Sequence, residues 1–170
     1  MASPIKFAHV VFRTSRFEEM IQWWTTVLEA TPRFANNFIA FLSYDSEHHR
    51  VAVVNFPGLE PGTHRAVGVE HIAYTVATID DLFGNYRRLK ALGIVPYWTI
   101  NHGMTLSAYY RDPDGNQAEF QIDICDLDAA DAFMRSDAFA ANPIGIDVDF
   151  DDLIARYDSG EAFESVTAYR

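Results

Sequence analysis

The sequence is short of cysteine, of basic residues and of long apolar runs, and each shortage excludes a class of protein. Cys125 is the single cysteine, so an intrachain disulfide, a thiolate zinc site and a CxxC redox pair are excluded. No window approaches about 18 consecutive apolar residues, and the first residues lack a basic region followed by an apolar run. We therefore expect a cytoplasmic protein that does not bind membranes.

The charge is negative and unevenly distributed. Twenty-four acidic residues face 13 basic ones, for a net charge of −11. Phosphate binding requires clustered Lys and Arg, so a nucleic-acid partner is not expected. Residues 126–170 hold eleven acidic residues and three arginines, which leaves the first 125 residues close to balance. With 49% hydrophobic residues, a chain of 170 residues is long enough for one well-packed globular domain.

An internal repeat organises the first three quarters of the chain. IKFAHVVF and VGVEHIAYTV each resemble a strand with histidine at the fifth position, and these histidines, His9 and His71, lie 62 residues apart. A helical spacing of apolar residues follows each strand. Short strand-like runs come next, FIAFLSY and RVAVVNF in the first half, TLSAYY and AEFQIDI in the second. The pattern predicts two βαβββ modules.

These modules predict an α+β fold and the boundaries of its parts. We expect a first module over residues 1–62, a second over residues 63–125, and an acidic helical C-terminal extension over residues 126–170. The Pro/Gly-rich GLEPGTHRAVG joins the modules. Because neither module is large enough to be stable alone, we expect them to pair in one structural domain, as a shared sheet or half-open barrel. Exposed sheet surface also favours a homo-oligomer.

Three polar residues of these modules could bind a metal ion. His9 and His71 hold equivalent positions, and Glu119 lies in the last strand of the second module, between Ala118 and Phe120. Taken singly, each is an ordinary strand residue. Together, two imidazoles and one carboxylate leave coordination positions open, which suits Fe(II) and O₂ chemistry, with Mn(II) as the alternative metal.

A motif around Glu119 resembles that of a known family. The sequence HGMTLSAYYRDPDGNQAE runs from His102 through Tyr109 and the DPDG turn to Glu119. It is similar to the signature of extradiol ring-cleaving catechol dioxygenases, in particular the small one-domain forms of the 2,3-dihydroxybiphenyl 1,2-dioxygenase type. These belong to the vicinal oxygen chelate (glyoxalase/bleomycin resistance/dioxygenase) superfamily. One departure is Ala108, where the family usually has a larger aliphatic residue.

The resemblance implies the vicinal oxygen chelate fold and a dioxygenase that inserts O₂ into a catechol, in aromatic hydrocarbon catabolism. It implies metal binding by His9, His71 and Glu119.

It also implies catalytic roles for three residues. His49, in EHHRVAV, would be the acid–base residue, with His48 as its competitor. His102 and Tyr109 would hydrogen-bond the bound catechol. The aromatic residues that could line a flat pocket are Phe12, Tyr74, Tyr97 and Trp98.

Three alternatives use related folds. A metal-dependent transferase of the fosfomycin-resistance kind has a similar ligand set, but this acidic chain offers no cation-rich pocket for a phosphonate. A glyoxalase I-like isomerase needs a further carboxylate, and a shift of Glu119 by 62 residues reaches Pro57 instead. A ligand-binding protein of the bleomycin-resistance kind needs no ligand triad.

Overall fold

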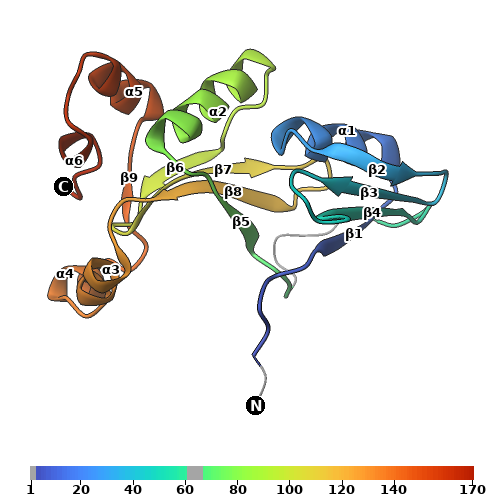
Figure 1. Ribbon diagram of the computed structural model, residues 1–170, viewed down its shortest axis with the longest axis horizontal. Coiled ribbons are helices and arrows are strands. Elements are labelled where there is room, and N and C mark those ends of the chain that lie inside the picture. Colours follow the sequence, from blue (N-terminus) through green and yellow to red (C-terminus); the bar gives the residue numbers. More distant parts are fainter. Residues whose placement is uncertain (1–2, 61–66) are drawn as a thin grey trace. The chain divides into compact units, whose positions relative to one another are not determined.

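The computed structural model describes residues 3–60 and 67–170, which form two compact units (Figure 1). The first unit comprises the described residues of Met1–Gly68 together with the turn Asp112–Asn116. The second comprises Val69–Arg111 and Gln117–Arg170. The predicted linker over residues 58–68 falls largely on residues 61–66, and the predicted boundary between residues 62 and 63 lies outside the described residues.

The elements follow one another in the order strand, helix and three strands, twice, before the C-terminal extension. They are β1 (Val10–Thr14), α1 (Phe17–Val27), β2 (Thr31–Ala35), β3 (Ile39–Ser43), β4 (Val51–Asn55), β5 (His71–Thr75), α2 (Ile79–Ala91), β6 (Trp98–Asn101), β7 (Thr105–Arg111), β8 (Gln117–Asp123), α3 (Leu127–Met134), α4 (Asp137–Ala141), β9 (Ile146–Asp147), α5 (Phe150–Asp158) and α6 (Phe163–Val166).

The first unit has a four-stranded sheet in the order β1-β4-β3-β2. β1 runs parallel to β4, and the other pairs are antiparallel. α1 buries one apolar face, with its buried residues spaced by three and four positions as an amphipathic helix requires. These residues are Phe17, Met20, Trp24 and Val27. This is the helical spacing of apolar residues that the sequence shows after the first strand.

The second unit repeats the same strand order, β5-β8-β7-β6, with β5 parallel to β8. α2 begins at the cap residue Thr78, whose side chain accepts a hydrogen bond from the Asp81 backbone N–H. The buried face of α2 carries Ile79, Leu82, Phe83, Tyr86 and Leu89. The repeated order confirms the predicted α+β fold built from two βαβββ modules.

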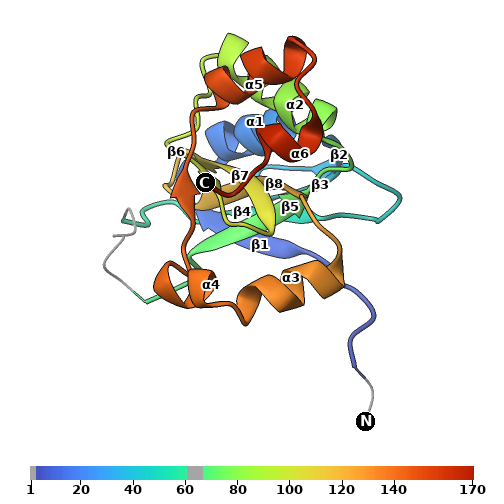
Figure 2. The same cartoon turned by 90° about the vertical axis from the view of Figure 1, so that its left-hand side faces the viewer.

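The C-terminal extension belongs to the second unit and is not purely helical. Its short strand β9 pairs antiparallel with β6 and adds a fifth strand to the sheet. At the start of α5, the Phe150 ring packs against the rings of Phe83 and Tyr86 of α2, with centroids 5.6 and 5.4 Å apart. Both views show α5 beside α2, with α3 and α4 on the side of the sheet away from α2 (Figures 1 and 2). A strand of two residues is too short to show an alternation of apolar and polar residues, so β9 could not be predicted from the sequence.

None of the helices in residues 3–60 and 67–170 is both long enough and apolar enough to cross a membrane.

Candidate active site

Glu119 lies on the sheet face opposite its two apolar neighbours. Ala118 and Phe120 are buried, and they point to the side of β8 against which α2 packs. Strand pairing aligns Glu119 with Ala73 of β5 and with Tyr109 of β7. Because directly paired residues share a face, these three side chains lie in one row across the sheet. The Glu119 carboxylate is nevertheless buried, since the residue is only 3% exposed.

The turn between β7 and β8 sets the register that produces this row. Asp112 exchanges backbone hydrogen bonds with Gly115 and Asn116, both 2.9 Å long, and Gly115 adopts a φ of 86° that favours glycine. The Asp112 carboxylate accepts hydrogen bonds from the backbone N–H groups of Asp114 and Asn116, at 3.0 and 2.8 Å. In the first unit, Trp24 Nε1 donates to the same carboxylate at 3.1 Å. Burial raises the pKa of this Asp112 carboxyl.

Four predicted site residues meet in the second unit. His71 Nε2 lies 3.0 Å from Glu119 Oε2, and His102 Nε2 lies 3.9 Å from Glu119 Oε1. His102 Nε2 is also 3.0 Å from the Tyr109 hydroxyl. Burial, followed by the negative charge of Glu119, raises the pKa of the Tyr109 phenol far above its ordinary value. The phenol therefore keeps its proton and acts as a hydrogen-bond donor in this cluster.

Two further predicted residues meet in the first unit. The parallel pairing of Val10 with Val51 brings the segment before β1 beside the segment before β4. The His9 and His49 rings lie there with centroids 4.3 Å apart. His49 is half-buried, whereas His48 is exposed. Burial, then the charges of His9 and His48, lowers the pKa of His49, so its ring favours the neutral form. The structure thus distinguishes the two neighbouring histidines by burial.

The site residues are accordingly placed in two groups, one in each unit. The second unit groups His71, Glu119, His102 and Tyr109, and the first unit groups His9 and His49. In the part of the chain that the structure describes, no three His, Cys, Asp or Glu side chains gather closely enough to hold a metal ion. The metal-ligand set therefore stays a prediction.

The candidate pocket aromatics have different surroundings. Trp98 is paired with Tyr109 across β6 and β7, and their rings lie 4.9 Å apart. The Tyr97 and Tyr109 ring centroids are 6.3 Å apart. Phe12 stacks on the buried Trp24, and Tyr74 stacks on the buried Phe120, at 4.9 and 5.7 Å. Trp98 therefore shares the face of Glu119 and Tyr109, whereas Phe12 and Tyr74 pack with core residues.

Sequence reasoning missed residues of the extension that contact this cluster. The Ile144 carbonyl is hydrogen-bonded to His102 Nδ1, and Trp98 Nε1 donates to Asp147 at 2.7 Å. The one available signal was the segment NPIGIDVDF, which has no helical spacing and contains the strand β9.

The strand pairing corrects one comparison between the two halves. A shift of 62 residues takes Glu119 to Pro57, which lies after β4. In the second sheet Glu119 pairs with Ala73, and the equivalent pair in the first sheet is Ala52 with Val11. The residue that corresponds to Glu119 in the first unit is therefore Ala52. Ala52 has no carboxylate either, so the first unit still lacks the additional ligand that a glyoxalase I-like site needs.

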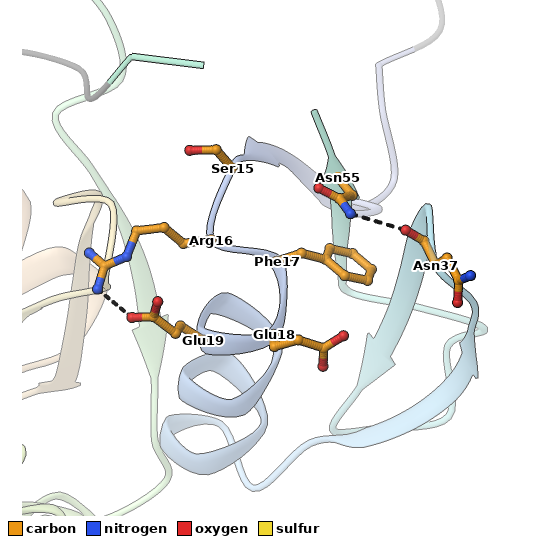
Figure 3. A pocket seen from close by; sticks show the side chains of 7 residues that line it. All are labelled: Ser15, Arg16, Phe17, Glu18, Glu19, Asn37 and Asn55. Atoms are coloured by element: carbon orange, nitrogen blue, oxygen red, sulfur yellow. Dashed lines mark hydrogen bonds and ion pairs between the residues drawn. The ribbon is translucent and has the colours of Figure 1, made fainter. Parts of the chain in front are cut away.

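A surface pocket of about 420 Å³ lies elsewhere in the first unit, at the start of α1 (Figure 3). Its lining residues are Ser15, Arg16, Phe17, Glu18, Glu19, Asn37 and Asn55. Arg16 is paired with Glu19, and Asn55 Nδ2 donates to the Asn37 carbonyl at 3.1 Å. None of the predicted site residues lines it, so this pocket is not the candidate site.

Comparisons with known proteins show the family of this chain. The family model described as the glyoxalase/bleomycin resistance protein/dioxygenase superfamily matches residues 6–120. The chain belongs to this superfamily. It is 46% identical over 151 residues to biphenyl-2,3-diol 1,2-dioxygenase 2 of Rhodococcus globerulus, covering 88% of this chain and 80% of that protein. It is 39% identical over 143 residues to biphenyl-2,3-diol 1,2-dioxygenase 3 of the same organism, covering 82% and 75%. Both relatives are named dioxygenases, as predicted for this chain.

Solved structures of the superfamily share the fold at low identity. Lactoylglutathione lyase from Agrobacterium tumefaciens matches with a TM-score of 0.57 and 15% identity, over 71% of this chain and 96% of that chain. The fosfomycin resistance protein FosX from Listeria monocytogenes matches with a TM-score of 0.55 and 17% identity, over 76% and 98%. These likenesses concern the fold alone, and they confirm the predicted vicinal oxygen chelate fold.

Proposed function

We propose that this protein is an extradiol ring-cleaving dioxygenase that inserts O₂ into a catechol of the biphenyl-diol-like class. The observation that carries the proposal is the buried Glu119 carboxylate, with His71 on one oxygen and His102 near the other. Tyr109, its direct partner on β7, adds a protonated phenol to the same face. The identity to two named biphenyl-2,3-diol 1,2-dioxygenases supports the substrate class.

The proposed metal ligands are His9, His71 and Glu119. A carboxylate oxygen and imidazole nitrogens are donors that Fe(II) accepts, and the 3.0 Å approach of His71 Nε2 to Glu119 provides two of these donors side by side. His9 is proposed because it immediately precedes β1, just as His71 begins the equivalent strand β5. When bound, Fe(II) would stabilise the deprotonated catechol and supply the electron transfer that O₂ activation needs.

The remaining polar residues handle protons and orient the substrate. Half-buried and favouring its neutral form, His49 accepts the proton that a catechol hydroxyl loses on binding. The Tyr109 hydroxyl accepts a hydrogen bond from the remaining hydroxyl of the substrate, while its own proton is directed to His102 Nε2. The Trp98 ring beside Tyr109 provides a flat apolar surface for the aromatic ring of the substrate.

The metal, the assembly and the location are part of the same proposal. Fe(II) is proposed over Mn(II), and metal analysis of the purified protein decides between them. A homo-oligomer is proposed from the exposed sheet surface, and light scattering measures its size. The cytoplasmic location is also a proposal, and fractionation of cells tests it.

The deciding experiment measures O₂ uptake by protein loaded anaerobically with Fe(II). On addition of 2,3-dihydroxybiphenyl or simple catechols, we expect O₂ consumption and a yellow ring-opened product, both lost in Glu119→Ala. Metal binding without O₂ consumption would favour the transferase of the fosfomycin-resistance kind. No metal binding at all would favour a ligand-binding protein of the bleomycin-resistance kind.

A further inference from the structure

The turn that carries His102 is enclosed by the C-terminal extension of the same unit. Asn101, which is buried, donates from Nδ2 to the Thr167 carbonyl at 2.7 Å. Its Oδ1 accepts a hydrogen bond from the Gly103 backbone N–H at 2.7 Å. A Cβ atom on Gly103 would lie 2.3 Å from Cε1 of Phe133 in α3, so the extension packs directly on the turn.

The loop over residues 142–145 contacts the same turn from another segment. Its Ile144 carbonyl is hydrogen-bonded to His102 Nδ1. Gly145 adopts a φ of 123°, and a Cβ there would lie 2.4 Å from the Asn101 carbonyl oxygen. The close approach therefore requires glycine at position 145.

The loop holds its own shape through one side chain. Asn142 donates from Nδ2 to the Gly145 carbonyl at 2.6 Å, and its Oδ1 accepts from the backbone N–H groups of Ile144 and Gly145, at 3.3 and 3.2 Å. The Ile144 carbonyl is thus presented to His102 by a closed hydrogen-bonded loop.

We infer that the 142–145 loop is a positioning element of the active site, which holds His102 with its proton on Nδ1 and leaves Nε2 free to accept from Tyr109. A carbonyl oxygen can only accept a hydrogen bond, so the nitrogen that faces Ile144 must carry hydrogen. In the neutral ring the other nitrogen is then an acceptor, and it lies 3.0 Å from the Tyr109 hydroxyl. The role of this arrangement in turnover rests on the proposed dioxygenase function.

The position of the proton on the His102 ring matters because Tyr109 has a single hydroxyl proton, which can be donated to only one acceptor. With Nε2 as acceptor, His102 holds the Tyr109 hydroxyl in a defined direction on the Glu119 face. With the proton on Nε2, His102 would present a donor to Tyr109 and leave the Ile144 carbonyl without its partner. Loss of the contacts behind a metal-ligating histidine typically changes metal affinity or activity by about 10- to 100-fold, and we expect an effect at the lower end of this range for His102, which is not a ligand.

The test uses two glycines of the extension that share a positive φ. Gly145→Ala introduces the clash with Asn101, whereas Gly160, with a φ of 92°, has open space around its Cβ position. Gly160→Ala therefore introduces similar backbone strain without contact to the turn. Asn142→Ala opens the loop without adding atoms, and it serves if Gly145→Ala does not fold.

The first measurement is nitrogen-15 NMR of the histidine rings in metal-free, full-length protein, with His102→Gln used to assign the signal. We expect the proton on Nδ1 of His102 in the wild type and in Gly160→Ala, and a mixture of the two tautomers in Gly145→Ala or Asn142→Ala. A wild-type ring with its proton on Nε2 would overturn the inference.

The second measurement is kcat/KM of the Fe(II)-loaded variants with 2,3-dihydroxybiphenyl. We expect a loss of about tenfold or more in Gly145→Ala and less than about twofold in Gly160→Ala. Equal losses in both variants would mean that the loop acts only on stability. If the wild type cleaves no catechol, the proposed function fails, while the NMR result still decides whether the loop fixes the tautomer.

Discussion

Tyr109 and Glu119 are direct partners across the β7–β8 ladder, and their side chains therefore share one face of the second sheet. Their chain neighbours Tyr110 and Phe120 are also buried, but they lie on the opposite face, where their rings meet at 5.8 Å. The two faces of one hairpin thus separate a polar site from the apolar core. Because of this alternation, a substitution at a residue that faces the site can be compared with the same substitution at its neighbour, which faces the core.

Glu119→Gln should abolish tight metal binding and ring cleavage. Glutamine keeps the shape of the side chain but removes the charge of the proposed ligand. We expect the affinity for Fe(II) to fall by more than the roughly 10- to 100-fold that is typical of changes behind the ligands. Iron content after dialysis and O₂ uptake measure the effect. The control is Glu70→Gln, which changes an exposed carboxylate hydrogen-bonded to Gln117. Iron retained by Glu119→Gln at the wild-type level would refute the ligand assignment.

Tyr109→Phe should lower kcat/KM by about 10- to 100-fold, the cost of one hydrogen bond to a charged or strongly polar group. It removes the hydroxyl that lies 3.0 Å from His102 Nε2 and leaves the ring in place. Tyr110→Phe removes a hydroxyl from the opposite face and should leave steady-state kinetics with catechols unchanged. A similar loss in both variants would show that the effect comes from packing rather than from contact with substrate.

His49→Gln should reduce kcat by about 100-fold or more, because it removes the proposed proton acceptor. His48→Gln, one residue earlier, should cause a clearly smaller loss, since His48 is exposed and touches the site only through its 2.6 Å contact with His49 Nδ1, whereas His49 contacts both His9 and Phe41. Single-turnover measurements under saturating catechol compare the two variants. The assignment of the acid–base residue would be reversed if His48→Gln caused the larger loss.

Glu161 should stabilise the extension at neutral pH and lose this effect in acid. Its carboxylate accepts two hydrogen bonds from Arg156, at 2.8 and 2.7 Å, and these bonds hold the pKa of Glu161 at about 2, below the ordinary 4.5. Because the pKa is lower in the folded state, the stabilisation is present above the ordinary value and disappears as the pH falls toward about 2.

Urea denaturation of the wild type and Glu161→Gln at a series of pH values tests this dependence. We expect the difference in midpoint to shrink between about pH 4.5 and about pH 2, and to weaken in high salt because both side chains of the pair are partly exposed to solvent. A difference that does not change with pH would mean that the carboxylate charge is not responsible.

Local spacing predicted most of the fold and several site residues. The steps of three and four between Phe17, Met20 and Trp24 define the buried face of α1, and the observed helix buries all three. The strand after the DPDG turn was also predicted, and the observed β8 places Glu119 on the face opposite Ala118 and Phe120. These features depend on how side chains repeat along one helix or one strand, and the local sequence alone determines that repeat.

Only the tertiary structure decided which distant groups meet. Nothing in the sequence distinguishes His48 from His49, since the difference lies in which ring is buried beside His9. The Ile144 carbonyl reaches His102 from 42 positions away in the chain, through a loop and a two-residue strand that have no period to detect. Such contacts depend on how separate elements pack, and this depends on the whole core rather than on any one segment. The chain's own sequence thus specified the elements and the candidate chemistry, and packing determined the partners that orient it.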